Sequence, residues 1–264
     1  MKIGFIGCGN MGGAMMRGIL DSGKCRPEDM MASDASKAML DMREKELGIC
    51  VSSDNCETAA FADVLFLAVK PQYYHDVISQ IRDTVCGRQV IVTIAPGKTL
   101  EWLEAEFGKP LKIIRTMPNT PAMVKEGMTG MCPNKNVGEE ELLAVRDIFS
   151  GFSKTEVISE NLLDVVTAVS GSSPAYVFLF IEAMADAAVA EGMARAQAYK
   201  FAAQAVLGSA KMVLETGKHP GELKDMVCSP GGTTIEAVRV LEEKGLRSAV
   251  FEAMKACVRK SREM

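Results

Sequence analysis

The stretch Ile3-Gly4-Phe5-Ile6-Gly7-Cys8-Gly9-Asn10-Met11-Gly12 decides the fold of this 264-residue chain. A short apolar run leads into a G-x-G-x-x-G turn, and the turn opens a segment with apolar residues at helical spacing as far as Ile19. Strand, glycine turn and helix in direct succession are typical of the first unit of a Rossmann-type sheet. There, Gly7 permits the tight bend, Gly9 allows close approach to the backbone, and Gly12 lets the helix pack on the sheet.

Further apolar runs continue the alternation of strands and helices along the N-terminal part of the chain. Strands are predicted at residues 30–33, 64–69, 90–94, 112–115, 127–132 and 155–158, with a late helix at 139–149. Strands that alternate with helices imply right-handed crossovers. We therefore expect an α/β fold with a doubly wound, mostly parallel sheet covered on both faces.

The strand pattern stops near residue 160. Helices are predicted beyond it, at residues 161–169, 173–191, 195–216, 220–226, 233–243 and 246–262. The sequence thus predicts a Rossmann-type dinucleotide-binding domain over residues 1–160 and an all-α domain over residues 161–264.

The segment 173–191 is apolar on nearly all sides, with Glu182 and Asp186 as its polar stripe. A helix that is apolar on all sides is usually buried on all sides. A domain of about a hundred residues has few positions where a helix is wholly internal. We infer that the segment packs against a second subunit, so that the chain forms a homodimer or a larger homo-oligomer. The alternative is the central helix of a monomer.

Composition and charge narrow the possible partners and compartments. The net charge of −4 gives no basic surplus for nucleic acid or an anionic membrane. We expect no secretory leader in the first residues, and we expect the most membrane-like stretch, 175–190, to be too short to span a bilayer comfortably. The eight cysteines are scattered without a C-x-x-C pair, and the two histidines form no metal site or Ser-His-Asp set. We expect a cytoplasmic protein without a metal.

The turn at residues 7–12 predicts a nicotinamide-dinucleotide site, because free N–H groups at a helix start face a pyrophosphate. Asp34 follows the second strand, where a carboxylate accepts from the ribose 2′-hydroxyl and repels a 2′-phosphate. This favours NADH. Ser33, Ser36 and Lys37 are possible donors to a 2′-phosphate, so NADPH remains open. Asp34 could instead cap the next helix.

The ends of two later strands point to the same cofactor. Lys70, after the run at 64–69, can meet a phosphate or ribose, or can simply be solvated. Ala95 and Pro96 follow the run at 90–94, where small residues suit a flat nicotinamide.

Near the end of the chain, residues 229–236 read Ser-Pro-Gly-Gly-Thr-Thr-Ile-Glu. Thr233-x-x-Glu236 fits a capping box at a helix start. A helix N-terminus approached through glycines suits a small carboxylate, and the hydroxyls of Ser229, Thr233 and Thr234 add donors and acceptors. The alternative is an ordinary well-capped helix.

Six motifs along the whole chain are similar to one family. They are Gly-Cys-Gly-Asn-Met-Gly at 7–12, Ala-Val-Lys-Pro at 68–71, Arg-Thr-Met-Pro-Asn-Thr-Pro at 115–121, Ala-Val-Ser-Gly-Ser-Ser-Pro-Ala-Tyr at 168–176, His-Pro-Gly-Glu-Leu-Lys-Asp at 219–225 and Ser-Pro-Gly-Gly-Thr-Thr at 229–234. With these motifs the chain resembles pyrroline-5-carboxylate reductase, an NAD(P)H-dependent oxidoreductase that catalyses the last step of proline biosynthesis.

The resemblance implies site residues and partners. The loop at 229–234 would hold the substrate carboxylate through Ser229, Gly231, Gly232, Thr233 and Thr234, with Thr234 near the ring nitrogen as the catalytic group. The helical domain would interlock with that of a partner. The expected dinucleotide-binding residues are Gly7, Cys8, Gly9, Asn10, Met11, Gly12, Ser33, Asp34, Asn55, Ala68, Val69, Lys70, Pro71, Ala95, Pro96 and Asn119. Many members prefer NADPH, and Asp34 departs from that pattern.

Two other functions share this domain plan. A β-hydroxyacid dehydrogenase or a different imine reductase is disfavoured by the loop at 229–234 and by the lack of a proton-relay residue. A non-catalytic sensor or scaffold that binds a nucleotide would need no carboxylate pocket.

Overall fold

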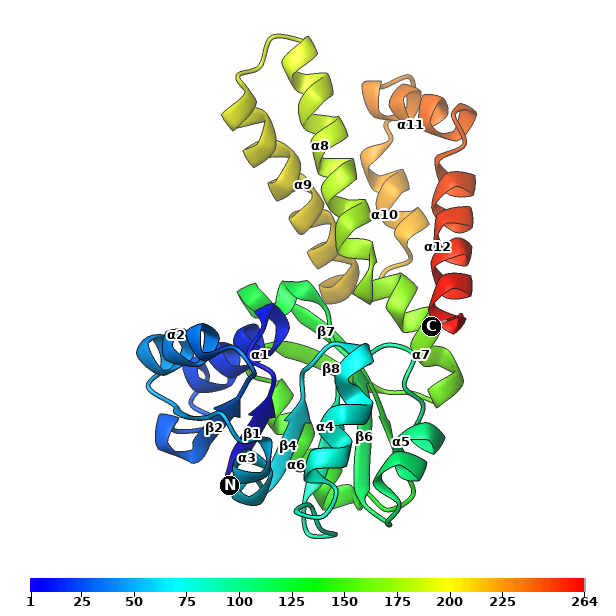
Figure 1. Ribbon diagram of the computed structural model, residues 1–264. Coiled ribbons are helices and arrows are strands. Elements are labelled where there is room, and N and C mark those ends of the chain that lie inside the picture. The colour runs from blue at the N-terminus through cyan, green and yellow to red at the C-terminus, as the bar shows by residue number, and fades with distance from the viewer. Residues whose placement is uncertain (264) are drawn as a thin grey trace. The chain divides into compact units, whose positions relative to one another are not determined.

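The computed structural model describes residues 1–263 and contains two compact units (Figure 1). The first unit runs from Met1 to Ser172 and includes the chain end from Cys257, and the second comprises Ser173–Ala256. The last helix, α12 (Leu246–Arg262), contributes to both.

The first unit is built on one eight-stranded sheet with the order β3-β2-β1-β4-β5-β6-β7-β8. Strands β1 to β6 are parallel, β7 runs antiparallel to β6, and β8 is parallel to β7. The strands are β1 (Ile3–Ile6), β2 (Met30–Ser33), β3 (Cys50–Ser52), β4 (Val64–Leu67), β5 (Val90–Thr93), β6 (Lys112–Met117), β7 (Gly127–Pro133) and β8 (Ser153–Val157). The expected mostly parallel sheet is confirmed.

Helices cover both faces of this sheet, because successive side chains of a strand point to opposite sides. One core contains Phe5 and Phe66 together with residues of α1 (Asn10–Asp21), α2 (Lys37–Leu47) and α6 (Glu139–Phe149). The other contains Leu65 and Leu67 together with residues of α3 (Asn55–Phe61), α4 (Tyr74–Ile81) and α5 (Leu100–Phe107). The doubly wound arrangement is therefore confirmed.

The structure contains one strand that was not predicted and shifts the ends of several others. The edge strand β3 (Cys50–Ser52) was not predicted, because three residues with a single branched aliphatic side chain give no apolar run. The predicted strand at 64–69 ends earlier, at Leu67, and the following residues leave the sheet to line a cleft.

The predicted helices at 161–169 and 173–191 form one helical run, Glu160–Ala190. It comprises the 3-10 turn η4 (Glu160–Leu162), α7 (Leu163–Val166), the π-helical turn η5 (Thr167–Gly171) and α8 (Ser173–Ala190). The first part, through η5, belongs to the first unit, where Asp164 accepts a hydrogen bond from Ser261 of α12 at 2.7 Å. The compact units therefore divide after Ser172, later than the expected boundary near residue 160.

This run is longer than the stretch judged from the sequence. By length and composition it is sufficient to cross a membrane, so the prediction that the segment is too short is wrong. One such helix is weak evidence for a membrane protein, because the core helix of a soluble protein or a signal sequence passes the same test of length and composition.

The second unit has four other helical segments with few buried side chains. They are α9 (Arg195–Thr216), α10 (Pro220–Val227), α11 (Thr233–Glu243) and the first part of α12. On α8, Phe178 and Leu179 are 64% and 67% exposed, and Ala185 is its one buried residue. Phe201 of α9 and Phe251 of α12 are similarly exposed. A helix this exposed is not buried as the central helix of a monomer, so that alternative is wrong.

Phe66 lies at the centre of the first core, stacked on Phe5 at 4.5 Å and 5.8 Å from the ring of Phe149. We expect Phe66→Ala to lower the free energy of unfolding by about 3–5 kcal/mol, because it leaves a cavity among rigid neighbours. Urea denaturation at a fixed protein concentration measures the change. The control is Leu143→Ala on α6, where the side chain is half-exposed and a loss below about 0.5 kcal/mol is expected. Equal losses for the two variants would contradict the packing described.

Candidate functional site

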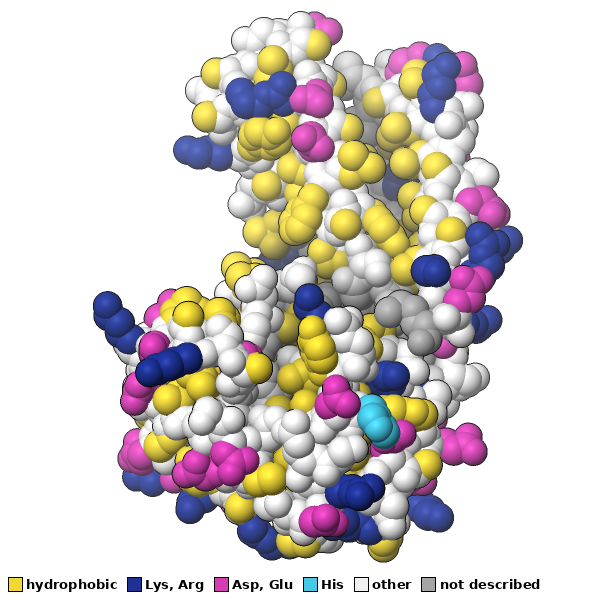
Figure 2. All heavy atoms as spheres, in the orientation of Figure 1, with side chains coloured by type: hydrophobic (Ala, Val, Ile, Leu, Met, Phe, Trp, Pro, Cys, Tyr) yellow, Lys and Arg dark blue, Asp and Glu magenta, His cyan; other side chains and the backbone are white. Residues whose placement is uncertain are grey.

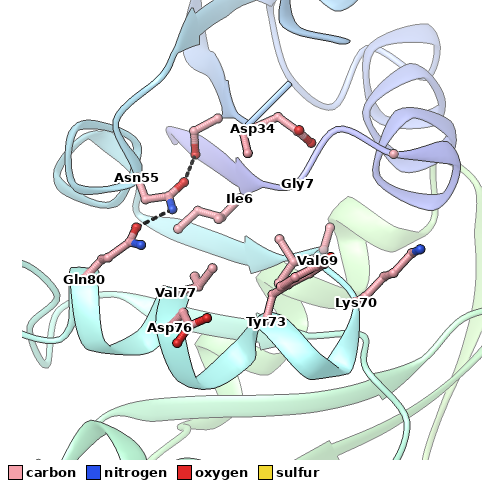
Figure 3. Close-up of a pocket in the computed structure, with 14 residues that line it drawn as sticks. Ile6, Gly7, Asp34, Asn55, Val69, Lys70, Tyr73, Asp76, Val77 and Gln80 are labelled. Atoms are coloured by element: carbon pink, nitrogen blue, oxygen red, sulfur yellow. Dashed lines mark hydrogen bonds between the residues drawn. The ribbon is translucent and has the colours of Figure 1, made fainter. Parts of the chain in front are cut away.

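A cleft of about 420 Å³ opens at the carboxyl ends of β1, β2 and β4 (Figure 3). This edge of a parallel sheet is where ligands bind in open α/β folds. Eight of the sequence-predicted cofactor residues line the cleft: Gly7, Gly9, Ser33, Asp34, Asn55, Ala68, Val69 and Lys70. The fold therefore brings together predicted residues from three strand ends and from α3.

The glycine turn has a backbone that only glycine tolerates at its first position. Gly7 has φ +106°, and a Cβ there would lie 2.6 Å from the carbonyl oxygen of Ala68. A Cβ on Gly12 would lie 2.5 Å from the carbonyl oxygen of Gly7. The turn ends at Gly9, the N-cap of α1, which has no side-chain cap within the described chain. The first N–H groups of α1 are therefore suited to an anion.

The carboxylate of Asp34 is fixed by two backbone donors. The N–H of Cys8 donates to Oδ2 and the N–H of Ser36 donates to Oδ1, at 2.8 and 2.9 Å. Ser36, whose hydroxyl accepts from the N–H of Met39, is the N-cap of α2. The alternative that Asp34 caps this helix is therefore wrong, and the carboxylate instead joins β2 to the glycine turn.

Polar side chains from three elements form a chain along one end of the cleft (Figure 3). The hydroxyl of Ser33 donates to Oδ1 of Asn55 at 2.7 Å, and Nδ2 of Asn55 donates to Oε1 of Gln80 at 2.8 Å. Lys70 lies at the other end of the row of labelled residues. It is the one cation that lines the cleft in the described chain.

The wall of the cleft formed by α4 consists of residues that were not predicted from the sequence. Tyr73, Asp76, Val77 and Gln80 project from the start and first turns of α4. Their spacing of three and four residues, one turn beyond a strand end, is the signal that would have found them. Behind this wall the buried Tyr74 hydroxyl donates to the carbonyl oxygen of Leu67 at 2.6 Å, and burial raises the pKa of this phenol.

Eight other predicted cofactor residues do not line the cleft: Cys8, Asn10, Met11, Gly12, Pro71, Ala95, Pro96 and Asn119. Cys8 is fully buried, and this burial raises the pKa of its thiol to about 12, so the group stays protonated. Asn119 is also buried: its amide donates to the carbonyl oxygen of Ser170 and accepts from the N–H of Met128. These two side chains are occupied in holding the fold.

The predicted substrate loop lies in the second unit, at the start of α11. Gly231 has φ +68°, and the N–H of Gly232 closes a turn onto the carbonyl oxygen of Ser229 at 3.0 Å. The predicted capping box is not formed, because Gly232 is the N-cap and Glu236 pairs with Arg239 instead. No side chain among residues 1–263 caps this helix start. Its N–H groups are thus left for an anion such as a carboxylate.

Comparisons with known proteins agree over the whole chain. Residues 2–97 match the family model described as NADP oxidoreductase, coenzyme F420-dependent, and residues 160–264 match the model described as pyrroline-5-carboxylate reductase dimerisation. The chain is 55% identical to pyrroline-5-carboxylate reductase of Escherichia coli strain K12, over 100% of this chain and 98% of the relative. It is 45% identical to that of Methanosarcina acetivorans, over 100% and 97%.

Solved structures give the same result. The pyrroline carboxylate reductase of Plasmodium falciparum with NADP bound has a TM-score of 0.91 at 34% identity, covering 100% of this chain and 97% of that one. The Coxiella burnetii pyrroline-5-carboxylate reductase has a TM-score of 0.93 at 34% identity, covering 99% and 97%. The full-length identity and the glycine-turn cleft lead to one conclusion: the chain belongs to the pyrroline-5-carboxylate reductase family.

Proposed function

We propose that this protein reduces the C=N bond of 1-pyrroline-5-carboxylate to give L-proline, the last step of proline biosynthesis, with NADH or NADPH as the reductant. The single observation that carries the proposal is the full-length identity of 55% to a reductase of that name. We assign dinucleotide binding to residues 1–160, and substrate binding and dimerisation to residues 161–264. The match of the dimerisation model to residues 160–264 supports the second assignment.

The cleft fits a dinucleotide. No atom of residues 1–263 lies within 4 Å of where a Cβ on Gly9 would be, so the backbone is open to a pyrophosphate at the start of α1. Asp34 and the Ser33–Asn55–Gln80 chain provide polar groups for the ribose and adenine side. Asn10, Met11, Ala95, Pro96 and Asn119 are proposed to contact the cofactor through their backbone or beyond the cleft. A reduced nicotinamide, when bound, supplies the hydride.

The substrate is placed by the start of α11. We propose that the N–H groups near Gly231, Gly232 and Thr233, together with the hydroxyl of Ser229, hold the carboxylate. The absence of a side-chain cap within the described chain leaves these groups for a ligand. Thr234 orients the imine nitrogen by a hydrogen bond.

This reaction requires little acid–base catalysis by the protein. A protonated imine carbon is already electrophilic, and the product nitrogen is basic, so placement in a dry site provides most of the rate. Reduction of a ketone would instead require a group that manages an alkoxide proton. The rate is therefore expected to depend mainly on the residues that orient the substrate.

We favour NADH over NADPH. Two carboxylates, Asp34 and Asp76, line the cleft, and Asp34 is held in place by two backbone N–H groups. A 2′-phosphate near Asp34 would meet a negative charge that does not swing away. Lys37, a possible phosphate ligand, does not line the cleft but lines a neighbouring hollow, which the carboxylates of Asp34 and Asp41 line as well.

The chain forms a homo-oligomer through its dimerisation domain, and we propose that the basic unit is a dimer. The exposed apolar side chains of α8 and α9 support this, because a water-facing Phe178 or Phe201 gains most from burial against a partner. The proposed compartment is the cytoplasm, with no nucleic acid and no membrane as partner.

The proposed reaction is tested by mixing the protein with 1-pyrroline-5-carboxylate and either NADH or NADPH. We expect the cofactor absorbance to fall with at least one of them, and proline to form in equal amount. If neither cofactor is oxidised, the proposed activity is wrong.

Asp34→Asn is expected to raise the NADPH/NADH ratio of kcat/KM by about tenfold, because it removes the charge and keeps an oxygen acceptor for the N–H of Cys8. The ratio of initial rates with the two cofactors measures it. The control is Asp83→Asn, an exposed carboxylate outside the cleft. An unchanged ratio in the Asp34 variant would show that this carboxylate does not set the preference.

Thr234→Ala is expected to lower kcat/KM for pyrroline-5-carboxylate by about tenfold, because one hydrogen bond to the reacting ring is lost. The Kd for NADH, followed by its fluorescence, should stay at the wild-type value. Thr234→Ser keeps the hydroxyl and should recover most of the activity. Unchanged steady-state kinetics in the alanine variant would rule out the role given to Thr234.

A further inference from the structure

Arg43 of α2 is buried, and its guanidinium reaches the glycine turn. Its Nε donates to the carbonyl oxygen of Cys8 at 3.2 Å, and its Nη2 donates to that of Gly9 at 3.4 Å. The residue is 9% exposed, which is unusual for a charged side chain. Its third nitrogen, Nη1, donates to Glu46 at 3.0 Å, and Glu46 also pairs with Arg17 at 3.2 Å.

The first turn of α1 leaves room for this guanidinium. A Cβ on Gly13 would lie 2.1 Å from Nη2 and 2.3 Å from Cζ of Arg43. Gly13 follows the G-x-G-x-x-G motif, and the roles of the three motif glycines do not explain why position 13 is a glycine. The space beside Gly13 is therefore the site of the arginine side chain.

Arg43 and Asp34 together hold three consecutive peptide groups of the turn. Asp34 accepts from the N–H of Cys8, while Arg43 binds the carbonyl oxygens of Cys8 and Gly9. The Gly9 carbonyl oxygen also accepts the N–H of Gly13 of α1 at 2.8 Å. In a trans peptide the N–H points opposite to the C=O. With these two carbonyls turned to Arg43, the N–H groups of Gly9 and Asn10 point away from it.

We propose that Arg43 is a positioning residue for the dinucleotide: it fixes the carbonyls of the glycine turn so that the N–H groups of Gly9 and Asn10 face the pyrophosphate. The proposal rests on the dinucleotide site proposed above. The buried positive charge also lies beside the turn that would receive two phosphate charges, which adds a favourable electrostatic contribution.

A residue that only joined α1 to α2 would affect stability alone. A positioning residue changes the affinity of the folded protein for the dinucleotide, without changing the handling of the imine once the cofactor is bound. The Kd of the folded protein for NADH separates the two roles.

The test measures NADH binding by fluorescence at a temperature where each variant is folded. We expect Arg43→Ala to raise the Kd by about tenfold, since two hydrogen bonds from a charged group are lost. Arg43→Lys keeps the stem and the charge but cannot span both carbonyls, so it should also raise the Kd. Arg17→Ala is the matched control: it removes the other partner of Glu46, does not touch the turn, and should bind as the wild type does.

Gly13→Ala supplies a second, independent arm. In the wild type its Cβ displaces the guanidinium, so the Kd should rise to a similar extent. In the Arg43→Ala background the same change should cause no further loss. A Kd for Arg43→Ala and Arg43→Lys within about twofold of the wild type, or additive effects of Gly13→Ala and Arg43→Ala, would overturn the proposal. Because binding is measured without substrate, the result does not depend on whether the protein reduces pyrroline-5-carboxylate.

Discussion

The close approach between the chain leaving β1 and the chain leaving β4 is the constraint on which the rest of the first unit depends. The N–H of Gly7 donates to the carbonyl oxygen of Ser33 at 2.7 Å, and the N–H of Ala68 donates to that of Ile6 at 2.8 Å. Three strand ends thus converge where no side chain fits at Gly7. These backbone contacts join three strands of the sheet, and they lie where α1 begins and where the cleft opens. A substitution at this point is therefore expected to affect both stability and cofactor binding.

The second unit follows a different constraint, because its helices do not bury their apolar faces within one chain. Phe178, Leu179 and Phe201 are each about two-thirds exposed. Burial of such side chains is the main favourable contribution to folding, and we propose that here it comes from the partner in the homo-oligomer. Folding of this unit is therefore linked to protein concentration. The proposed substrate loop, on α11, lies in the part of the chain that most needs the partner.

The sequence predicted what depends on local pattern and missed what depends on tertiary contact. The strands, the helices of the second unit and eight of the residues that line the cleft follow from periodicity, glycines and family motifs. The short strand β3 lacks an apolar run, so only its pairing with β2 reveals it. The capping box at Thr233 fitted a pattern, yet Glu236 pairs with Arg239 instead. Arg43 is one of many charged residues on its helix until the fold brings it to the turn.

The way the two histidines are used bears on the chemistry. Nδ1 of His75 lies 2.8 Å from Glu106 on the surface, and Nδ1 of His219 accepts the N–H of Gly221 at the start of α10. Both rings serve local structure, and neither lines the cleft. A ketone reductase needs a proton relay, which is usually a histidine or a lysine, whereas a protonated imine needs mainly to be held near a hydride donor. The two sites proposed to hold the ligands are the glycine turn, bonded to Asp34 and Arg43, and the start of α11, which no side chain of the described residues caps. Both suit a reaction that depends on orientation.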